Sequence, residues 1–146
     1  MLDAHDSLLL FRAVDAEHGR VFWFPAGGGV EDGEDVEAAA KREVSEETGL
    51  TDLQLGPEVW HRRHVFTWRG VELDQRERWF VAHVARFEPD AGAMTETEKL
   101  DIKECRWWTL EELDATHDLL TPRDLPRRLR SLLADGPPEH PIELGV

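Results

Sequence analysis

The stretch Gly28–Leu50, GGVEDGEDVEAAAKREVSEETGL, constrains the fold of this 146-residue chain more than any other feature of its sequence. Asp35 is a residue type that caps the start of helices, and Gly49 is a type that ends them in a left-handed conformation. Between these two caps the spacing predicts a helix over Val36–Thr48. The run of glycines at 27–29 predicts a loop that leads into this helix.

Acidic residues occupy the helix face that a core would cover. At roughly 100° per residue, one arc of the helix carries the apolar residues Val36, Ala40 and Val44. Glu43 and Glu47 fall inside the same arc, and Glu46 lies at its edge. Like charges one turn apart repel and a buried carboxylate is costly, so an ordinary solvated face fits this pattern poorly. A hard divalent cation, which binds carboxylate oxygen and leaves room for substrate phosphates, is the simplest physical explanation.

The same stretch resembles the signature of a known family. It matches, at every fixed position, the pattern G-x5-E-x7-R-E-U-x-E-E-x-G-U of the Nudix hydrolases, in which U is a bulky aliphatic residue. The matching residues are Gly28, Glu34, Arg42, Glu43, Val44, Glu46, Glu47, Gly49 and Leu50. The resemblance implies an α/β fold, a Nudix-type α/β/α sandwich around a mixed β-sheet. We therefore expect a Nudix hydrolase domain at residues 1–135 and a C-terminal tail at residues 136–146.

The resemblance also implies an activity. It is the metal-dependent hydrolysis of a pyrophosphate bond in a nucleoside diphosphate linked to another moiety. As in similar proteins, Glu43, Glu46 and Glu47 would hold Mg²⁺ or Mn²⁺ together with the backbone carbonyl of Gly28. A carboxylate would take the proton from the attacking water, and the candidates are Glu43, Glu46 and a glutamate of a later loop, Glu98.

Two other parts of the family pattern have expected roles in this chain. Glu34 and Arg42 are expected to tie the loop to the helix as an ion pair rather than to touch substrate. Phe87–Lys99 is a polar loop, and similar proteins often supply a further carboxylate from a loop in this place. Glu96 and Glu98 are the candidates, although solvated loop acids are the commoner outcome in proteins generally.

The rest of the chain predicts a sheet followed by two helices. Strands are expected at Ser7–Val14, Val21–Phe24, Val59–Trp68, Gln75–Val84 and Glu104–Trp108. Thr109 has capping-box spacing to Glu112 and predicts a short helix. A packing helix is expected to start near Asp124, and the proline-containing tail Gly136–Val146 is expected to be extended or disordered unless a partner subunit holds it.

Arginines on the predicted hairpin are candidates for contacts to substrate phosphates. They are Arg62, Arg63, Arg76 and Arg78, and Trp60 or Trp68 is a candidate for stacking on a base. The alternative is that alternating arginines mark the solvated face of a sheet and that tryptophan belongs to the core.

The charge and cysteine content of the chain limit its possible binding partners and cellular location. The net charge of −14 argues against binding a nucleic-acid duplex or an anionic membrane, whereas a small phosphorylated nucleotide remains compatible if cations reverse the charge locally. The single cysteine, Cys105, cannot form an internal disulfide, and no targeting or membrane-spanning segment is visible, so a cytoplasmic location is expected. A homodimer is left open.

The range of possible substrates is narrowed only by residues that particular subclasses of the family tend to carry and that this chain lacks. Family members that act on ADP-ribose tend to carry a proline beyond the signature, where this chain has Val65 and Phe66, and those acting on dinucleoside polyphosphates tend to carry a tyrosine, of which there is none. A nucleoside triphosphate or small nucleotide conjugate is therefore expected first. The alternative from another class is a catalytically silent Nudix domain that senses a nucleotide or binds a partner. Such domains commonly lose signature glutamates, and this chain retains all of them.

Overall fold

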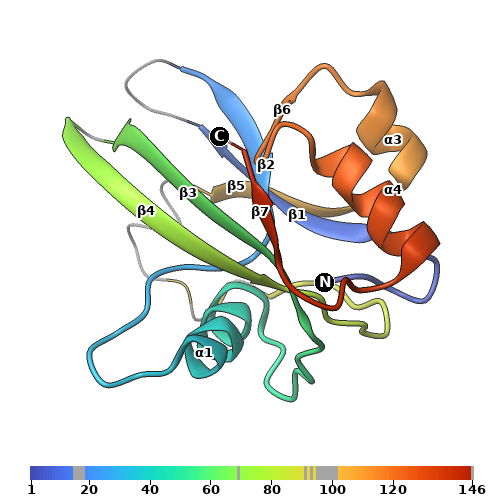
Figure 1. Ribbon diagram of the computed structural model, residues 1–146, viewed down its shortest axis with the longest axis horizontal. Coiled ribbons are helices and arrows are strands. Elements are labelled where there is room, and N and C mark those ends of the chain that lie inside the picture. The colour runs from blue at the N-terminus through green and yellow to red at the C-terminus, as the bar shows by residue number, and fades with distance from the viewer. Residues whose placement is uncertain (15–18, 69, 91, 93, 95–101, 146) are drawn as a thin grey trace.

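Two mixed sheets and the helices around them make up the structure, a computed structural model that describes residues 1–14, 19–68, 70–90, 92, 94 and 102–145 (Figure 1). The helices are α1 (Val36–Thr48), α3 (Leu110–Ala115) and α4 (Leu125–Asp135). The strands are β1 (Leu8–Val14), β2 (Val21–Phe24), β3 (Glu58–Trp68), β4 (Val71–Phe80), β5 (Ile102–Trp108), β6 (Leu119–Leu120) and β7 (Ile142–Leu144). The α/β fold class is confirmed, and the strands divide into two sheets.

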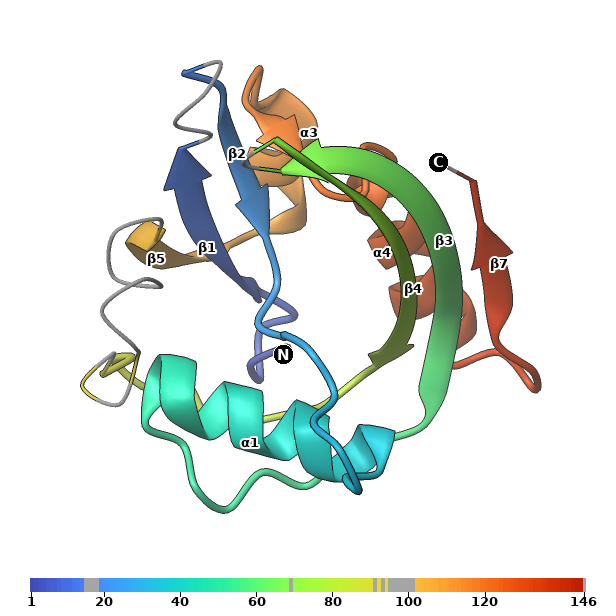
Figure 2. The ribbon, with the colours of Figure 1, turned by 90° about the vertical axis from the view of Figure 1, so that its left-hand side faces the viewer.

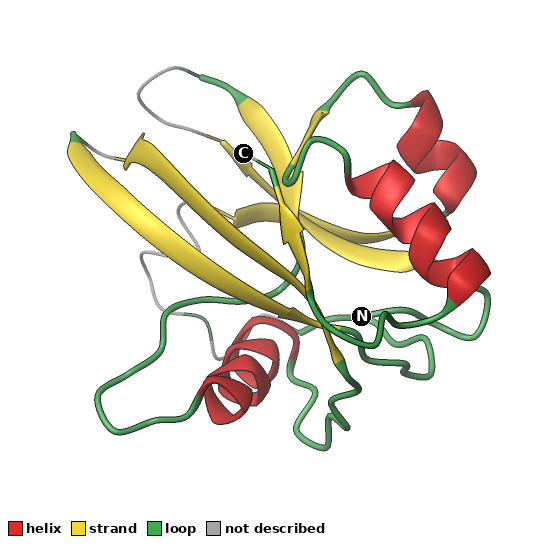
Figure 3. Cartoon of the chain, viewed as in Figure 1, coloured by secondary structure: helices red, strands yellow, loops and turns green. Residues whose placement is uncertain are grey.

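The first sheet has the strand order β5-β1-β2-β6. Strand β1 pairs antiparallel with both β2 and β5, and β6 pairs parallel with β2. The second sheet has the order β4-β3-β7, with β3 antiparallel to β4 and parallel to β7. Figure 2 shows α1 below the two sheets, and Figure 3 shows α3 and α4 together at another side of them.

The main hydrophobic core joins both sheets to α3 and α4. Its buried members come from nearly every strand, and α4 contributes Leu125 and Leu129 at i, i+4 spacing. A smaller apolar cluster joins Val44 of α1 to Leu53 and Ala82. The signature helix is therefore anchored by a separate apolar contact, which leaves part of its inward face for other groups.

Strand β4 differs from its predicted position. The expected range was Gln75–Val84, whereas the ladder with β3 begins at the turn, where Trp68 pairs with Val71. Near its other end, the peptide N–H of Val81 donates to Pro57 O at 3.1 Å, and Gly56 donates back to Val81 O at 2.8 Å. Beyond Phe80 the chain therefore pairs with the two residues that directly precede β3.

The C-terminal tail also differs from expectation. Ile142–Leu144 forms β7 and pairs with β3 of the same chain, and Leu144 is buried. The tail is therefore held by a strand of its own chain and not by a partner subunit, which the sequence did not predict. Near the N-terminus, Leu2 makes isolated bridges to Leu8 and His83.

Two local predictions are confirmed. The α1 bounds are those expected, and α3 begins with a complete capping box in which Thr109 and Glu112 satisfy each other's backbone N–H groups. None of the helices in the described ranges is both long enough and apolar enough to cross a membrane.

Candidate functional site

Helix α1 has well-defined ends. The Asp35 carboxylate accepts from the Ala38 N–H at 2.7 Å, which satisfies one of the free donors of the first turn. Gly49 ends the helix at φ +78°, and its N–H donates to Ser45 O at 2.9 Å. An added Cβ at Gly49 would also meet Asp90 O at 3.3 Å. These caps fix where the helix begins and ends.

The helix buries two carboxylates. Glu43 is 6% exposed and Glu47 is 3% exposed, beside buried Ala39 and Val44. Glu47 also lies near Cys105 of β5. Burial, together with the negative charge of Glu47, raises the pKa of the Cys105 thiol to about 12. Two buried acids one turn apart are costly unless positive charge or hydrogen-bond donors compensate them.

Arg42 supplies much of that compensation. Its Nε and Nη2 donate to the two oxygens of Glu34, both at 3.0 Å. Nη1 donates to Glu43 Oε1 at 2.9 Å and to Glu46 Oε2 at 3.2 Å, and Nη2 also reaches Gly29 O at 2.8 Å. Hydrogen bonds from Arg42 and from the Glu31 N–H hold the pKa of Glu34 below its ordinary value. The expected Glu34–Arg42 ion pair is present, and Arg42 contacts two of the candidate ligands as well.

The glycine loop lies directly against the two buried acids. The Gly27 N–H donates to Glu47 Oε2 at 3.0 Å. At Gly28, a Cβ atom would fall 2.3 Å from the Glu43 carboxyl carbon, a distance that real Cβ atoms do not show. Any side chain at 28 would therefore force the Glu43 carboxylate or the loop to move.

The donors fit a hard divalent cation in their chemistry. Glu43, Glu46 and Glu47 offer carboxylate oxygen, and the Gly28 backbone lies beside Glu43, which is the ligand type that Mg²⁺ and Mn²⁺ prefer. No group of three or more acid, histidine or cysteine side chains is gathered closely enough to hold a metal in the part of the chain that the structure describes. Arg42 instead lies between Glu43 and Glu46, and Glu47 bonds to the loop.

Replacing Gly28 by alanine is expected to damage the site. The new methyl group must displace either the loop or the Glu43 carboxylate, at a cost of about 1–3 kcal/mol in unfolding free energy. Binding of Mn²⁺, followed by electron paramagnetic resonance, should weaken as well. Gly29→Ala is the matched control, because a Cβ at 29 meets nothing within 4 Å and should shift stability by no more than about 0.5 kcal/mol. Equal behaviour of the two variants would contradict the close approach at 28.

Arg62 is buried in an ion-pair cluster on the inner face of β3. Its Nε and Nη2 donate to the Glu77 carboxylate at 2.8 and 2.7 Å, and Trp79 Nε1 donates to the same group at 2.9 Å. His64 Nε2 lies 2.9 Å from Glu77 Oε1. Burial acts to raise the pKa of Glu77, but these partners hold it below its ordinary value. A substrate phosphate would compete with Glu77 for Arg62.

Arg76 and Arg78 lie on the opposite face of the hairpin from Arg62. Both are exposed, and Arg78 donates to the two oxygens of Glu58 at 2.6 and 2.7 Å. This contact lowers the pKa of Glu58 to about 2. Arg63 lies on the same face as Arg76 and donates to both oxygens of Asp74 at 2.8 and 2.7 Å. The four candidate arginines are therefore not brought together around one point.

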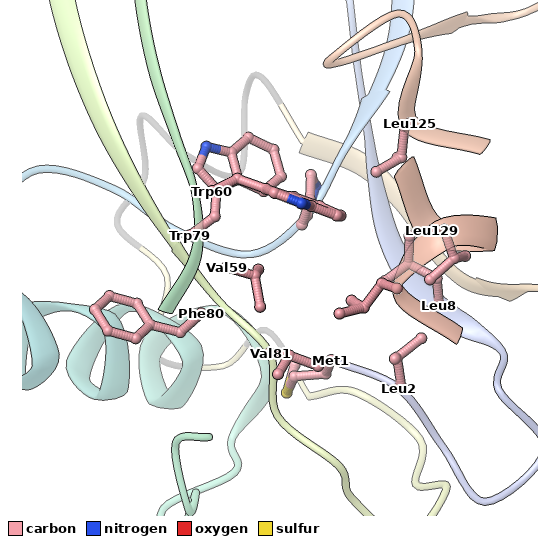
Figure 4. A pocket seen from close by; sticks show the side chains of 12 residues that line it. Met1, Leu2, Leu8, Val59, Trp60, Trp79, Phe80, Val81, Leu125 and Leu129 are labelled. Atoms are coloured by element: carbon pink, nitrogen blue, oxygen red, sulfur yellow. The ribbon is translucent and has the colours of Figure 1, made fainter. Parts of the chain in front are cut away.

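Trp60 is a core residue. It is 7% exposed and its ring centroid lies 5.9 Å from that of Trp79. Both rings border an apolar cavity of about 50 Å³, opposite Leu125 and Leu129 of α4 (Figure 4). That volume is on the order of one or two water molecules, too small for a nucleobase. The Trp68 side chain, Glu96 and Glu98 lie outside the residues that the structure describes.

Comparison with known proteins gives a consistent family. A family model described as the NUDIX domain matches residues 1–129. An RNA pyrophosphohydrolase from Caulobacter vibrioides is 34% identical over 112 residues, which cover 68% of this chain and 60% of that protein. Another from Novosphingobium aromaticivorans is 27% identical over 132 residues, covering 84% and 79%. The chain thus spans about 60% of the length of the first of these relatives.

Solved structures share the fold. An Ap4A hydrolase from C. elegans, in a binary complex, superposes with a TM-score of 0.62 at 23% identity, covering 88% of this chain and 87% of the other. A MutT protein from Methanosarcina mazei Go1 gives 0.60 at 22% identity, covering 88% and 86%. At these identities the likeness concerns the arrangement of the sheets and helices.

Sequence reasoning missed several contacts of the site. The Gly27 N–H bond to Glu47 and the Arg42 contacts to Glu43 and Glu46 depend on how the loop folds back over the helix. The pairing of Arg62 with Glu77 depends on the hairpin register, in which these two residues are directly opposite. The i, i+4 spacing of Arg42 and Glu46 was the one signal in the sequence that could have indicated such a contact.

Proposed function

Since this chain belongs to the Nudix family, as the match over residues 1–129 shows, we propose that it is a metal-dependent hydrolase of a pyrophosphate bond in a nucleotide. The observation that carries the proposal is the pair of buried carboxylates of α1, Glu43 and Glu47, which lie against the glycine loop. A helix meant only for packing would place apolar residues there. The names of the relatives, RNA pyrophosphohydrolase and Ap4A hydrolase, support the same bond type.

The residues of the chain take distinct roles in this proposal. Glu43, Glu46 and Glu47, with the Gly28 carbonyl, would hold Mg²⁺ or Mn²⁺. When bound, such an ion screens phosphate charge and lowers the pKa of a coordinated water. Arg42 positions Glu43 and Glu46 through its Nη1 and ties the helix to the loop through Glu34.

One carboxylate must accept the proton of the attacking water. Glu43, Glu46 and Glu98 are the candidates, with Glu96 as the neighbour against which Glu98 can be compared. We expect Glu96→Gln and Glu98→Gln to differ in kcat by at least about tenfold, since a general base typically contributes more than that. Steady-state rates of both variants decide the question. Wild-type rates in both would place the base on α1.

Among the candidate arginines, we propose Arg62 for the substrate side. It lies on the inner face of the hairpin together with Trp79, whereas Arg76 and Arg78 lie on the outer face. A phosphate that approached Arg62 would have to share it with Glu77.

The substrate we propose first is a nucleoside triphosphate or a small nucleotide conjugate. A second candidate, the 5′-triphosphate end of an RNA, is favoured by the names of the relatives that match 68% and 84% of this chain. The net charge of −14 limits any such contact to the RNA terminus, because the remaining backbone would be repelled.

A substrate panel tests the proposal. Purified protein with Mg²⁺ or Mn²⁺ is incubated with nucleoside triphosphates, nucleotide conjugates, dinucleoside polyphosphates and a 5′-triphosphorylated RNA oligonucleotide, and the products are identified by mass. We expect cleavage between phosphates in at least one class. Binding of a nucleotide without turnover of any substrate would favour the catalytically silent alternative.

A further inference from the structure

Strand β4 forms one edge of its sheet, and the three-residue β7 forms the other. The order β4-β3-β7 leaves β4 with a single neighbouring strand among the residues that the structure describes. Its first six residues are all exposed, and it lies at the left border of the molecule in Figure 1. The free N–H and C=O groups along such an edge are a template for another strand.

The charges on this edge occur in a self-complementary order. On the outer face of β4, every second residue is charged, and the order along the strand is acid, acid, base, base: Glu72, Asp74, Arg76 and Arg78. An antiparallel copy presents the same residues in reverse. Every acid then faces a base, and a two-fold axis produces each pair twice.

We propose that β4 pairs antiparallel with β4 of a second copy of this chain, about a two-fold axis at Gln75. In this register Glu72 faces Arg78 of the second copy, and Asp74 faces its Arg76. The two three-stranded sheets then join into one continuous sheet. The proposal concerns assembly and does not depend on the hydrolytic function.

Neighbouring registers are unfavourable. An axis at Asp74 places that acid against itself, and an axis at Arg76 places that base against itself, so like charges would be directly opposite. An axis between two residues would set an outer-face side chain opposite an inner-face one, which the pleat forbids. In the register centred on Gln75, each outer-face charge of β4 faces an opposite charge of the second copy. Asp74 and Arg78 would share these contacts with their partners on β3, Arg63 and Glu58.

The inner face of the strand supports the same register. Val71 is 57% exposed and Leu73 is 37% exposed. With the axis at Gln75, Val71 lies opposite Trp79 of the second copy, so an exposed aliphatic side chain gains an aromatic neighbour across the strands. Such pairs contribute to sheet stability. Leu73 lies opposite Glu77, whose carboxylate is bound to Arg62 of its own chain.

Charged residues on an edge strand can also prevent it from pairing with another strand. The order of positive and negative charges along the strand distinguishes prevention of pairing from self-association. A single sign of charge along an edge repels a second copy, whereas two acids followed by two bases attract it in one register. The net charge of −14 opposes association at long range. At an ionic strength of about 0.15 M that repulsion is screened beyond about 8 Å. The charges on the outer face of β4 therefore determine whether two copies associate.

Sedimentation velocity with complementary charge reversals tests the proposal. Wild type is expected to dimerise as its concentration rises, and Arg76→Glu and Asp74→Arg should each weaken self-association by at least about tenfold, since each creates two like-charge pairs. Mixing the two variants should restore a heterodimer, because position 74 of each variant then faces an opposite charge at position 76 of the other. The control is Arg123→Glu, a reversal at an exposed residue before α4, which should leave dimerisation unchanged.

A disulfide test locates the axis. Gln75→Cys should cross-link to itself under mild oxidation, because residue 75 faces residue 75, whereas Glu72→Cys should not, since its two copies would be about 20 Å apart along the strands. A monomeric wild type, a dimer that is indifferent to both reversals, or equal cross-linking at 72 and 75 would each overturn the proposal. A strand from a different protein as the true occupant would appear as the first of these outcomes.

Discussion

Replacing Glu47 with glutamine is expected to lower hydrolysis by about a hundredfold or more, because it removes one charged oxygen ligand from the site. The same change should leave the metal-free protein as stable as wild type or more so. Glutamine keeps the shape and can still accept the Gly27 N–H bond, while the repulsion between Glu43 and Glu47 is removed.

Melting curves in EDTA and in millimolar Mg²⁺ accompany the rate measurement. A ligand that binds only the folded state stabilises it by mass action, so Mg²⁺ should raise the Tm of wild type more than that of Glu47→Gln. Glu37→Gln is the control, since Glu37 is an exposed first-turn acid of the same helix. If metal-free Glu47→Gln melted well below wild type, Glu47 would be a structural acid bound to protein partners, and its assignment as a metal ligand would be wrong.

Removing Arg42 should produce the largest loss of stability at the site. Arg42→Met is expected to lower the free energy of unfolding by about 2 kcal/mol at neutral pH, because buried Glu43 loses a charged donor while Glu34 and Glu46 lose theirs. This loss of unfolding free energy is small for a buried ion-pair network, because the Arg42 side chain is 24% exposed. Arg42→Lys should recover only part of it, because an ammonium cannot make the forked contacts of a guanidinium.

The loss caused by Arg42→Met should depend on pH. Arg42 holds the pKa of Glu34 below its ordinary value of 4.5, so this part of the stability is present above 4.5 and is lost as the pH falls through the lowered value. Urea unfolding of wild type and Arg42→Met across this range should therefore show the difference shrinking toward acid. A difference that was constant with pH, or absent at neutral pH, would contradict the network.

The parts of the fold that depend on local sequence could be predicted. Helix α1 and its caps follow from Asp35 and Gly49, and the burial of Glu43 and Glu47 follows from the helical period. The arc was slightly misplaced, since Ala39 is more deeply buried than Ala40.

The parts that depend on distant pairing could not be predicted. Strands β6 and β7 are two and three residues long, too short for a periodic pattern, and each exists because a strand far along the chain offers a free edge. The division into two sheets likewise follows from which edges are used. In the candidate site, the signature identified the helix acids, whereas the Gly27 contact required the path of the loop.

We propose that this protein hydrolyses a pyrophosphate bond with a divalent cation held by the carboxylates of α1. The most direct measurement follows product formation by mass, on the best substrate of the panel, for wild type and Glu47→Gln in Mg²⁺ and in excess EDTA. We expect turnover by wild type in Mg²⁺ alone, with little in the other three samples. Full turnover in EDTA, or an undiminished rate for Glu47→Gln in Mg²⁺, would contradict the claim.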